Sequence, residues 1–231
     1  MIKRCEHIGL ATLYLGDCME FAEVLCGDAL ITDPPYGINL GKMSGKDRSK
    51  YASEGWAKQA NRPDDYYVIH GDDKPFDPSP LLRYPKVVLW GGNHFASRLP
   101  DSRSWIVWDK REETGSDNQA DCELAWTNLP GPVRMHHQLW RGICRRGEEN
   151  VSRQGRVHPT QKPVRLMEFC IAQCRLDPDA VIDDWFMGSG TTGVAAVRHG
   201  FRFVGVEIDA HHFDTACQRI EDEQRQLKLA L

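Results

Sequence analysis

The residues with the most distinctive chemistry are four consecutive ones, Asp33-Pro34-Pro35-Tyr36, which follow a short apolar run. Two prolines restrict the backbone, so Asp33 and Tyr36 should project in set directions from a strand end. The Asp33 carboxylate and the Pro34 carbonyl can accept hydrogen bonds from an amino group, and Tyr36 offers a flat face to a planar base. Two such acceptors would localise the lone pair of a ring-conjugated amino nitrogen and prepare it to attack a methyl group. An ordinary Pro-Pro turn is the alternative.

A second group is the glycine-rich turn Gly188-Ser-Gly-Thr-Thr-Gly193, which lies between an expected strand and an expected helix. Its glycines would let a ligand approach the backbone, and the helix start offers free N–H groups. Glu207 ends the next expected strand and could accept hydrogen bonds from both hydroxyls of a ribose. The pattern predicts an adenosine-type cofactor, leaving open a nicotinamide dinucleotide, S-adenosylmethionine or an unliganded turn. Asp184 could pair with a cationic amino group, which favours a ligand with an amino acid end.

The charge distribution contradicts the charge total. The net charge of −4 argues by itself against a nucleic-acid partner, but eight basic and only two acidic residues lie between Pro130 and Arg165. Positive charge gathered in one place attracts a polyanion, so we expect a basic loop at residues 130–158 that contacts phosphates. A solvated loop with surplus arginine is the alternative. The expected phosphate contacts are Arg141, Arg145, Arg146, Arg153 and Arg156.

These groups need elements to position them. Short apolar runs alternate with helical stretches, which predicts an α/β sheet covered on both faces. Strands are expected at residues 11–15, 29–32, 86–90, 104–108, 122–126, 180–183 and 203–206, and helices at 19–25, from Pro163 onward, at 192–199 and at 212–227. Residues 37–65 are rich in Gly, Lys, Ser and Asp without an apolar period, so we expect a flexible loop there.

Composition sets the outer limits. With 231 residues, 41% of them hydrophobic and 27% charged, the chain is expected to form a single domain spanning 1–231. There is no apolar run long enough for a membrane span and no signal-peptide core, which predicts a cytoplasmic protein without a membrane partner. The eight cysteines contain no C-x-x-C pair, so we expect free thiols and no metal site.

The motifs together resemble a known family. Thr32 to Gly37 and Phe186 to Thr192 resemble the amino-group DNA methyltransferases, which transfer methyl from S-adenosylmethionine to adenine N6 or cytosine N4. A third motif, His158-Pro-Thr-Gln-Lys-Pro163, is similar to the segment that precedes the cofactor turn in that family. Because the Asp-Pro-Pro-Tyr motif comes first, the order is that of the β class. The resemblance implies a Rossmann-like S-adenosylmethionine-dependent methyltransferase fold: a mostly parallel seven-stranded sheet, helices on both faces, and a permuted motif order.

The same resemblance implies residue roles. The base would be bound and activated by Asp33, Pro34, Pro35 and Tyr36. The cofactor would be bound by Asp184, Phe186, Gly188, Ser189, Gly190, Thr191 and Glu207, with Thr160 and Lys162 closing over it. Double-stranded DNA would be the substrate, contacted by the 37–65 and 130–158 loops, and a homodimer is common in the family. Asp at the first position of the tetrapeptide is usual for adenine and Ser for cytosine, so adenine N6 is expected.

The chain departs from the family pattern in two places. Trp185 stands where the family usually has proline, which should reshape the pocket wall without removing a donor or acceptor. Only residues 141–157 occupy the place of the usual target-recognition insertion, so sequence recognition should be short or loose. The segments 90–94 and 108–110 end expected strands. Their residues could line a pocket or belong to the core and surface.

Other function classes remain open from the sequence. Enzymes that methylate RNA or a protein glutamine amide use a related Pro-Pro-Tyr turn, but they generally carry the glycine turn before it. A nicotinamide oxidoreductase would explain the glycine turn and leave Asp33-Pro-Pro-Tyr36 without a role. A catalytically silent DNA-binding protein would leave the intact motif residues unexplained.

Overall fold

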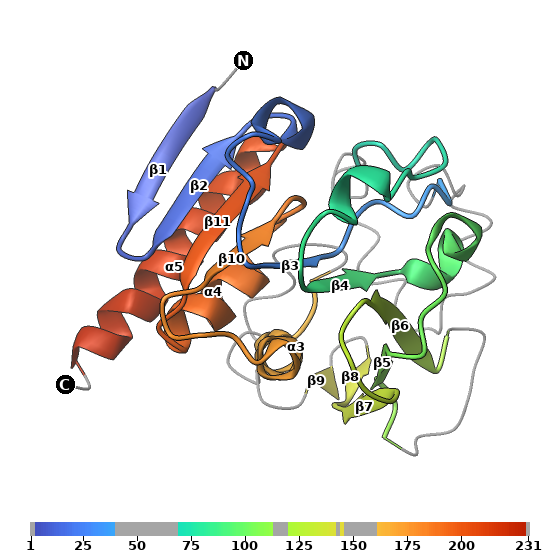
Figure 1. Cartoon of the computed structure of the whole chain (residues 1–231). Helices are drawn as coiled ribbons and strands as arrows, with labels where there is room; N and C mark the ends of the chain where they lie inside the picture. Colours follow the sequence, from blue (N-terminus) through green and yellow to red (C-terminus); the bar gives the residue numbers. More distant parts are fainter. Residues whose placement is uncertain (1–2, 40–68, 113–119, 142–143, 146–160, 230–231) are drawn as a thin grey trace.

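The main feature of the fold is one mixed β-sheet with a layer of helices on it (Figure 1). The computed structural model describes residues 3–39, 69–112, 120–141, 144–145 and 161–229. Within them, nine strands form a sheet of order β1-β2-β11-β10-β3-β4-β6-β5-β7. The strands are β1 (Arg4–Ile8), β2 (Ala11–Leu15), β3 (Ala29–Thr32), β4 (Val87–Trp90), β5 (Trp105–Asp109), β6 (Cys122–Thr127), β7 (Arg134–His137), β10 (Val181–Asp184) and β11 (Arg202–Glu207). A separate pair joins β8 (Trp140–Arg141) to β9 (Cys144–Arg145).

The centre of the sheet is parallel. Strands β2, β11, β10, β3 and β4 are neighbours in that order and all run in the same direction. Residues of β3 and β4 are buried throughout, as continuous apolar runs predict for strands covered on both faces. The carboxyl ends of these five strands therefore meet at one edge, where open α/β sheets bind their ligands.

Among the described residues, three α-helices cover one face of the sheet: α3 (Val164–Cys174), α4 (Thr191–Arg198) and α5 (Ala210–Leu229). Helix α4 packs between α3 and α5 (Figure 1). Together with sheet residues such as Ile31 and Ile182 they form what we call the helix-side core. Cys170 and Cys174 lie four residues apart on the inner face of α3 and are buried there as thiols, as the spacing predicted.

The opposite face is covered differently. Alternate residues of the same strands, such as Leu30 and Leu89, form a second cluster that we call the turn-side core. In the described residues this core is closed by single turns of 3₁₀ helix: η1 (Cys18–Phe21), η5 (Ser79–Leu81), η6 (Gly92–His94) and η7 (Ala96–Arg98). The α-helix expected at 19–25 is thus one 3₁₀ turn, because Cys18 and Phe21 are both buried and the i, i+3 spacing of such a turn points both inward. Within the described residues, the expected α-helices lie on one face, and the other face carries these 3₁₀ turns.

The expected seven strands are nine in the described residues, because the two outermost strands escaped prediction. Strand β1 pairs antiparallel with β2, and β7 pairs parallel with β5. Both are edge strands with mostly exposed side chains, so neither shows the buried alternation by which strands are recognised. Strands β7, β8 and β9 also replace part of the loop expected at 130–158, whereas residues 146–158 lie outside the described part.

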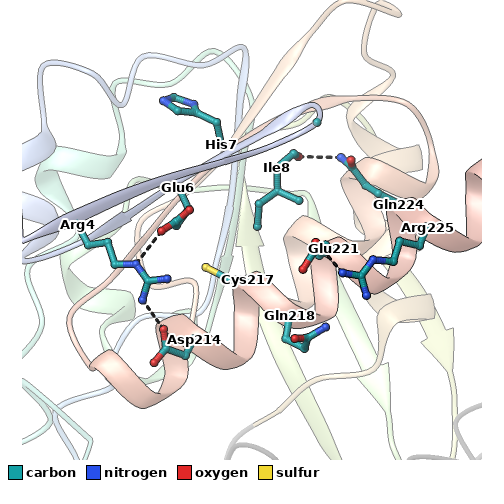
Figure 2. Close-up of a pocket in the computed structure, with 11 residues that line it drawn as sticks. Arg4, Glu6, His7, Ile8, Asp214, Cys217, Gln218, Glu221, Gln224 and Arg225 are labelled. Atoms are coloured by element: carbon teal, nitrogen blue, oxygen red, sulfur yellow. Dashed lines mark hydrogen bonds and ion pairs between the residues drawn. The ribbon is translucent and has the colours of Figure 1, made fainter.

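A groove between β1 and α5 lies at the β1 edge of the sheet, the edge opposite β7 (Figure 2). Its charged side chains pair with one another: Arg4 contacts Glu6 at 2.7 Å and Asp214 at 2.6 Å. Gln224 Nε2 also donates to the Ile8 carbonyl at 2.7 Å. These contacts hold the last helix to the first strand. In the described residues, no helix is long and apolar enough to cross a membrane.

Candidate active site

Asp33 and Tyr36 lie together immediately beyond β3. The Tyr36 hydroxyl donates to Asp33 Oδ1 at 2.6 Å, and burial together with the Asp33 charge raises the pKa of Tyr36 well above its usual range. The exit of the motif is anchored by Asp72, whose Oδ1 accepts the backbone N–H groups of Gly37 at 2.9 Å and Ile38 at 3.1 Å. The tetrapeptide is therefore held at both ends.

The turn after β4 holds the Tyr36 ring. His94 stacks on it with the ring centroids 4.7 Å apart and the planes at 13°. Gly91 has a positive φ of 72°, and a Cβ atom built there would lie 2.0 Å from Tyr36 Cε1. Glycine is thus required at position 91 both for the backbone conformation and for the space that the ring occupies. The open question about segment 90–94 is answered for these two residues: they contact the motif tyrosine.

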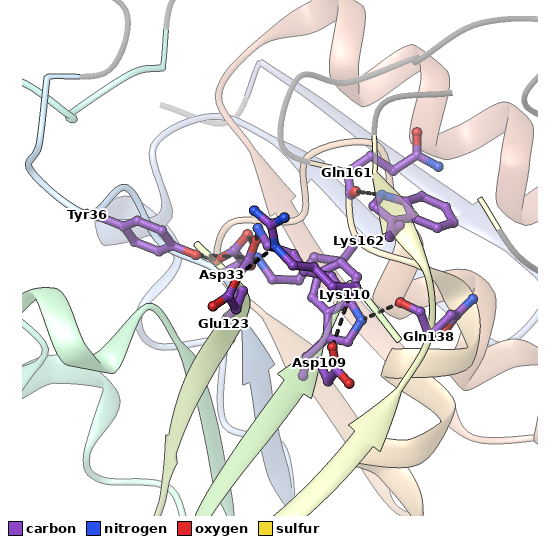
Figure 3. A network of polar contacts seen from close by, with 12 residues as sticks. Asp33, Tyr36, Asp109, Lys110, Glu123, Gln138, Gln161 and Lys162 are labelled. Carbon is purple, nitrogen blue, oxygen red and sulfur yellow. Dashed lines mark hydrogen bonds and ion pairs between the residues drawn. The ribbon is translucent and has the colours of Figure 1, made fainter. Parts of the chain in front are cut away.

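Lys162 contacts the other oxygen of the Asp33 carboxylate (Figure 3). Its Nζ donates to Asp33 Oδ2 and lies 3.4 Å from both the Tyr36 hydroxyl and Glu123 Oε2. Glu123 Oε1 in turn accepts from Lys110 Nζ at 2.7 Å. Although burial opposes charge on both groups, the surrounding opposite charges outweigh it: they raise the pKa of Lys162 and lower that of Glu123. Lys162 and Glu123 are therefore both charged near neutral pH.

Strand direction explains how these distant residues meet. Strand β6 is antiparallel to both β4 and β5, so its first residues lie level with the carboxyl ends of those two strands. Glu123 pairs with Trp108 in this register, and Lys110 follows β5. The helix-side core contains Ile31, Trp108 and Ala125. These residues lie two positions from Asp33, Lys110 and Glu123, respectively. Because alternate strand residues share a face, these side chains point toward the segment before α3 that carries Lys162.

Lys162 contacts the tetrapeptide, and its expected role over the cofactor stays a prediction. The family resemblance put it over the cofactor, whereas its ammonium group contacts the carboxylate expected to hold the base. Its neighbour is fixed too, because the Gln161 carbonyl accepts from Trp140 Nε1 at 3.1 Å. Thr160, the other residue expected to close over the cofactor, lies outside the described residues, as do Arg146, Arg153 and Arg156. The backbone of Arg141 and Arg145 belongs to the β8–β9 pair.

The glycine-rich turn connects β10 to α4. Gly188 and Gly190 have positive φ values of 53° and 76°, and a Cβ at Gly190 would lie 2.8 Å from Ala216 Cβ. Arg219 of α5 donates to the Ser189 carbonyl at 2.6 Å and to the Ser189 hydroxyl at 2.9 Å. The turn is thus shaped by glycine and held from behind by an arginine that the sequence pattern did not single out. Helix α4 begins at Thr191, one residue before the start expected at 192.

Glu207 closes the far side of this turn at the end of β11. Its Oε2 accepts from the Gly188 N–H at 2.7 Å and its Oε1 from the Asp209 N–H at 2.8 Å. Burial raises its pKa to about 7, against the opposing effect of these hydrogen bonds. Each oxygen has a second lone pair, so the carboxylate can accept further hydrogen bonds.

Asp184 joins the two motifs. Its Oδ1 accepts from the Thr32 hydroxyl at 2.6 Å and from the Phe186 N–H at 3.1 Å. Burial raises the pKa of Asp184 to about 6. The Phe186 N–H also donates to the Thr32 hydroxyl at 3.3 Å. Because Thr32 precedes Asp33, these hydrogen bonds connect the tetrapeptide to the segment before the glycine turn across neighbouring strands β3 and β10.

Trp185, which replaces the usual proline, belongs to the turn-side core. Its Nε1 donates to the Tyr84 hydroxyl at 2.8 Å, and Tyr84 donates to the buried Asp183 carboxylate at 2.6 Å. The expectation that Trp185 reshapes the pocket wall is therefore not supported by its contacts. It packs in the interior.

Sequence reasoning missed Glu123 and left Lys110 open. A usable signal was present: Glu123 lies two residues before Ala125 in an otherwise apolar strand, so it shares the inward face of that strand. Charge on such a face requires a partner. No group of acidic, histidine or cysteine residues in the described residues could hold a metal ion.

Comparisons with known proteins show similarity to DNA methylases over part of the chain. Residues 108–218 match the family model of N6/N4 methyltransferases described as DNA methylase, a stretch that includes Lys162 and the glycine turn but not residues 33–36. The type II methyltransferase M2.DpnII of Streptococcus pneumoniae is 38% identical over 122 residues, which are 53% of this chain and 43% of that protein. The chain spans less than half the length of the curated relatives it matches.

Solved structures share the fold at low sequence identity. The PvuII DNA methyltransferase (cytosine-N4-specific) aligns with a TM-score of 0.57 and 16% identity, over 99% of this chain and 94% of that chain. The complex of M1.HpyAVI with SAM aligns with a TM-score of 0.51 and 20% identity, over 91% and 98% of the two chains.

Proposed function

We propose that this chain is an N6/N4 DNA methylase and transfers a methyl group from S-adenosylmethionine to an exocyclic amino group in double-stranded DNA. One observation carries the proposal. The Asp33–Tyr36 motif and the glycine turn lie at the carboxyl ends of neighbouring parallel strands, joined by the hydrogen bond between Thr32 and Asp184. The proposed base site and the proposed cofactor site are thereby adjacent.

The residues at the glycine turn suit this cofactor. Positive φ values at Gly188 and Gly190 give a turn whose backbone a ligand can approach closely, at the start of helix α4. Glu207 retains acceptor capacity on both oxygens, which suits the two hydroxyls of a ribose. When bound, S-adenosylmethionine supplies a methyl group activated by its sulfonium charge. The fold shared with the M1.HpyAVI complex with SAM supports the same assignment.

The residues of the chain would act mainly on the base. A base swung out of the duplex would stack on the Tyr36 face opposite His94. Its amino group would donate to Asp33, which orients the nitrogen lone pair toward the methyl group. As the bond between nitrogen and methyl forms and the bond between methyl and sulfur breaks, positive charge develops on the nitrogen. The Asp33 carboxylate stabilises that charge, and the proton leaves afterwards.

Adenine N6 is the proposed target, because Asp stands at the first position of the tetrapeptide. To test this, the chain is expressed in a methylation-free host, and the host DNA is sequenced for modified bases. Tritiated methyl incorporation is measured in parallel on DNA, RNA and protein, and calorimetry compares S-adenosylmethionine with NAD. We expect N6-methyladenine in DNA. N4-methylcytosine would change the target base alone, whereas incorporation confined to RNA or protein would exclude the proposal.

Cofactor affinity should depend on pH through Glu207. The pKa of Glu207 is raised to about 7, so the carboxyl is largely protonated in mildly acidic solution. Ribose hydroxyls donate to the ionised form, so cofactor binding releases a proton from this group. Affinity should fall by up to about tenfold for each pH unit below the pKa and level off above it. Calorimetry in buffers of different ionisation enthalpy measures both the affinity and the proton release.

Glu207→Gln is the matched control for this effect, because it keeps the shape and removes the titration. The variant should bind the cofactor more weakly, with a flatter pH profile between about pH 5.5 and 8. An unchanged slope in the variant would assign the pH dependence to another group.

Arg145 and Arg146 are proposed to contact DNA phosphates within the basic segment. Replacing both with Gln should weaken DNA binding and lower the slope of log affinity against log salt concentration by up to about two units. Equilibrium binding over a salt series measures the slope. The control removes the same charge elsewhere: Arg202→Gln with Arg225→Gln, at exposed positions on β11 and α5. Equal slopes for the two double variants would place the basic segment away from DNA.

A further inference from the structure

We propose that Lys162 occupies the place of the target amino group before DNA binds, and that Glu123 accepts Lys162 when the base enters. In this role Glu123 is a positioning residue: it acts on Asp33 only through Lys162. The inference rests on the proposed function, because it concerns the carboxylate that would hold the base. It adds residues of β5 and β6 that the motifs do not contain.

The first step concerns the two oxygens of Asp33. Oδ1 accepts from the Tyr36 hydroxyl at 2.6 Å, and Oδ2 accepts from Lys162 Nζ. A target amino group donates an N–H to the same carboxylate, so it needs one of these positions. An ammonium group presents the same kind of N–H donor. Lys162 therefore makes the contact that the proposal assigns to the base.

The second step identifies which donor can leave. Lys162 Nζ already lies 3.4 Å from Glu123 Oε2, so a small side-chain movement exchanges one carboxylate for another. Glu123 is held ready for this exchange because Lys110 binds its other oxygen at 2.7 Å (Figure 3). The Tyr36 hydroxyl forms part of the rigid motif, and its ring is fixed by the stack on His94. Lys162 is the donor with a second position to occupy.

Charge gives the reason for the movement. Positive charge develops on the attacking nitrogen during methyl transfer, and an ammonium group on the same carboxylate would oppose it. The Lys162 side chain is only 6% exposed, so releasing it without a partner would leave a buried charge unpaired. Glu123 removes that penalty. The pairs Lys162–Asp33 and Lys110–Glu123 also keep the group of four residues electrically balanced before and after the exchange.

The surroundings restrict the movement to the side chain. The Trp140 indole fixes the backbone at Gln161, and Pro163 caps the start of α3. The Trp90 ring lies beside the ammonium, with Nζ 5.5 Å from the ring centroid. The ammonium can thus move between two carboxylates along one aromatic wall without a change in the fold.

A double-mutant cycle tests the exchange with Glu123→Gln, Lys162→Met and the double variant. Glu123→Gln keeps the shape but removes the second partner, so Lys162 should stay on Asp33 and compete with the base. We expect the KM for DNA to rise about 10- to 100-fold, with cofactor affinity unchanged. In the Lys162→Met background, the same substitution should change KM less than about threefold. Equal losses in both backgrounds would overturn the exchange.

Lys110→Met provides a second measurement with the opposite sign. Removing Lys110 takes away one of the cations that contact Glu123, so Glu123 should attract Lys162 more strongly. Lys162 should then leave Asp33 more easily, and the KM for DNA should fall. General damage to the site would raise KM in both Lys110→Met and Glu123→Gln, and that result would also overturn the exchange. Urea unfolding verifies that each variant is folded. A folded parent chain that transfers no methyl to DNA would instead overturn the proposed function, and the exchange with it.

Discussion

Replacing Asp33 with Ala should reduce methyl transfer to DNA by at least about 10³-fold while leaving the affinity for S-adenosylmethionine within about twofold. The substitution removes the acceptor that orients the amino nitrogen and the charge that stabilises it during transfer. The cofactor contacts proposed at Gly188 and Glu207 do not involve this side chain. Tritiated methyl incorporation measures the loss, and calorimetry measures the cofactor affinity.

Two further variants sharpen this result. Asp33→Asn keeps an acceptor oxygen without the charge, so it should retain a small part of the activity and separate orientation from charge stabilisation. Asp73→Ala is the control for removing a nearby carboxylate, because Asp73 is exposed on the surface. It should transfer methyl at the parental rate. Parental activity in Asp33→Ala would remove Asp33 from the proposed mechanism.

Replacing Gly91 with Ala should lower methyl transfer by at least about 100-fold through displacement of the Tyr36 ring. A Cβ atom at this position would lie 2.0 Å from Tyr36 Cε1, and the backbone φ of 72° adds strain. The ring must therefore leave its stack on His94, which removes the surface proposed for the base. The rate of methyl transfer and the near-ultraviolet dichroism of the aromatic side chains report the two effects.

Gly200→Ala separates the clash from the strain. Gly200 has a similar φ of 78°, but a Cβ there would meet nothing within 4 Å. Both substitutions should cost about 1–3 kcal/mol of unfolding free energy for the left-handed backbone. Only Gly91→Ala should lose activity. If Gly200→Ala lost as much activity as Gly91→Ala, the loss would reflect stability and not the position of Tyr36.

The strands that carry the motifs could be predicted from the sequence, whereas the outer strands could not. Strand β3 is a short apolar run and β10 begins as one; Asp33 follows β3 and Asp184 ends β10. Strand β7 is an edge strand whose side chains are mostly exposed, so no apolar period identifies it. Burial on both faces produces the pattern, and an edge strand lacks it.

The candidate site divides in the same way. Asp33, Tyr36 and the glycine turn are local motifs, and their types and spacing are visible in a few consecutive residues. The contact of Lys162 with Asp33 joins positions far apart in the chain, and Glu123 reaches them only through the antiparallel register of β6. Such pairings depend on strand order, which no local pattern specifies. The resemblance therefore identified the motifs, whereas the contact between Lys162 and Asp33 emerges only from the fold.

The shared direction of the five central strands divides the molecule into two ends with separate tasks. The tetrapeptide, the glycine turn and Glu207 follow or end a strand, whereas the turns that contain Asp28, Pro85 and Gly200 precede β3, β4 and β11 at the other end. We expect substitutions in those turns to change the free energy of unfolding and to leave methyl transfer unchanged. Substrate choice and stability can thus evolve independently, because the residues that set them lie at opposite ends of the strands.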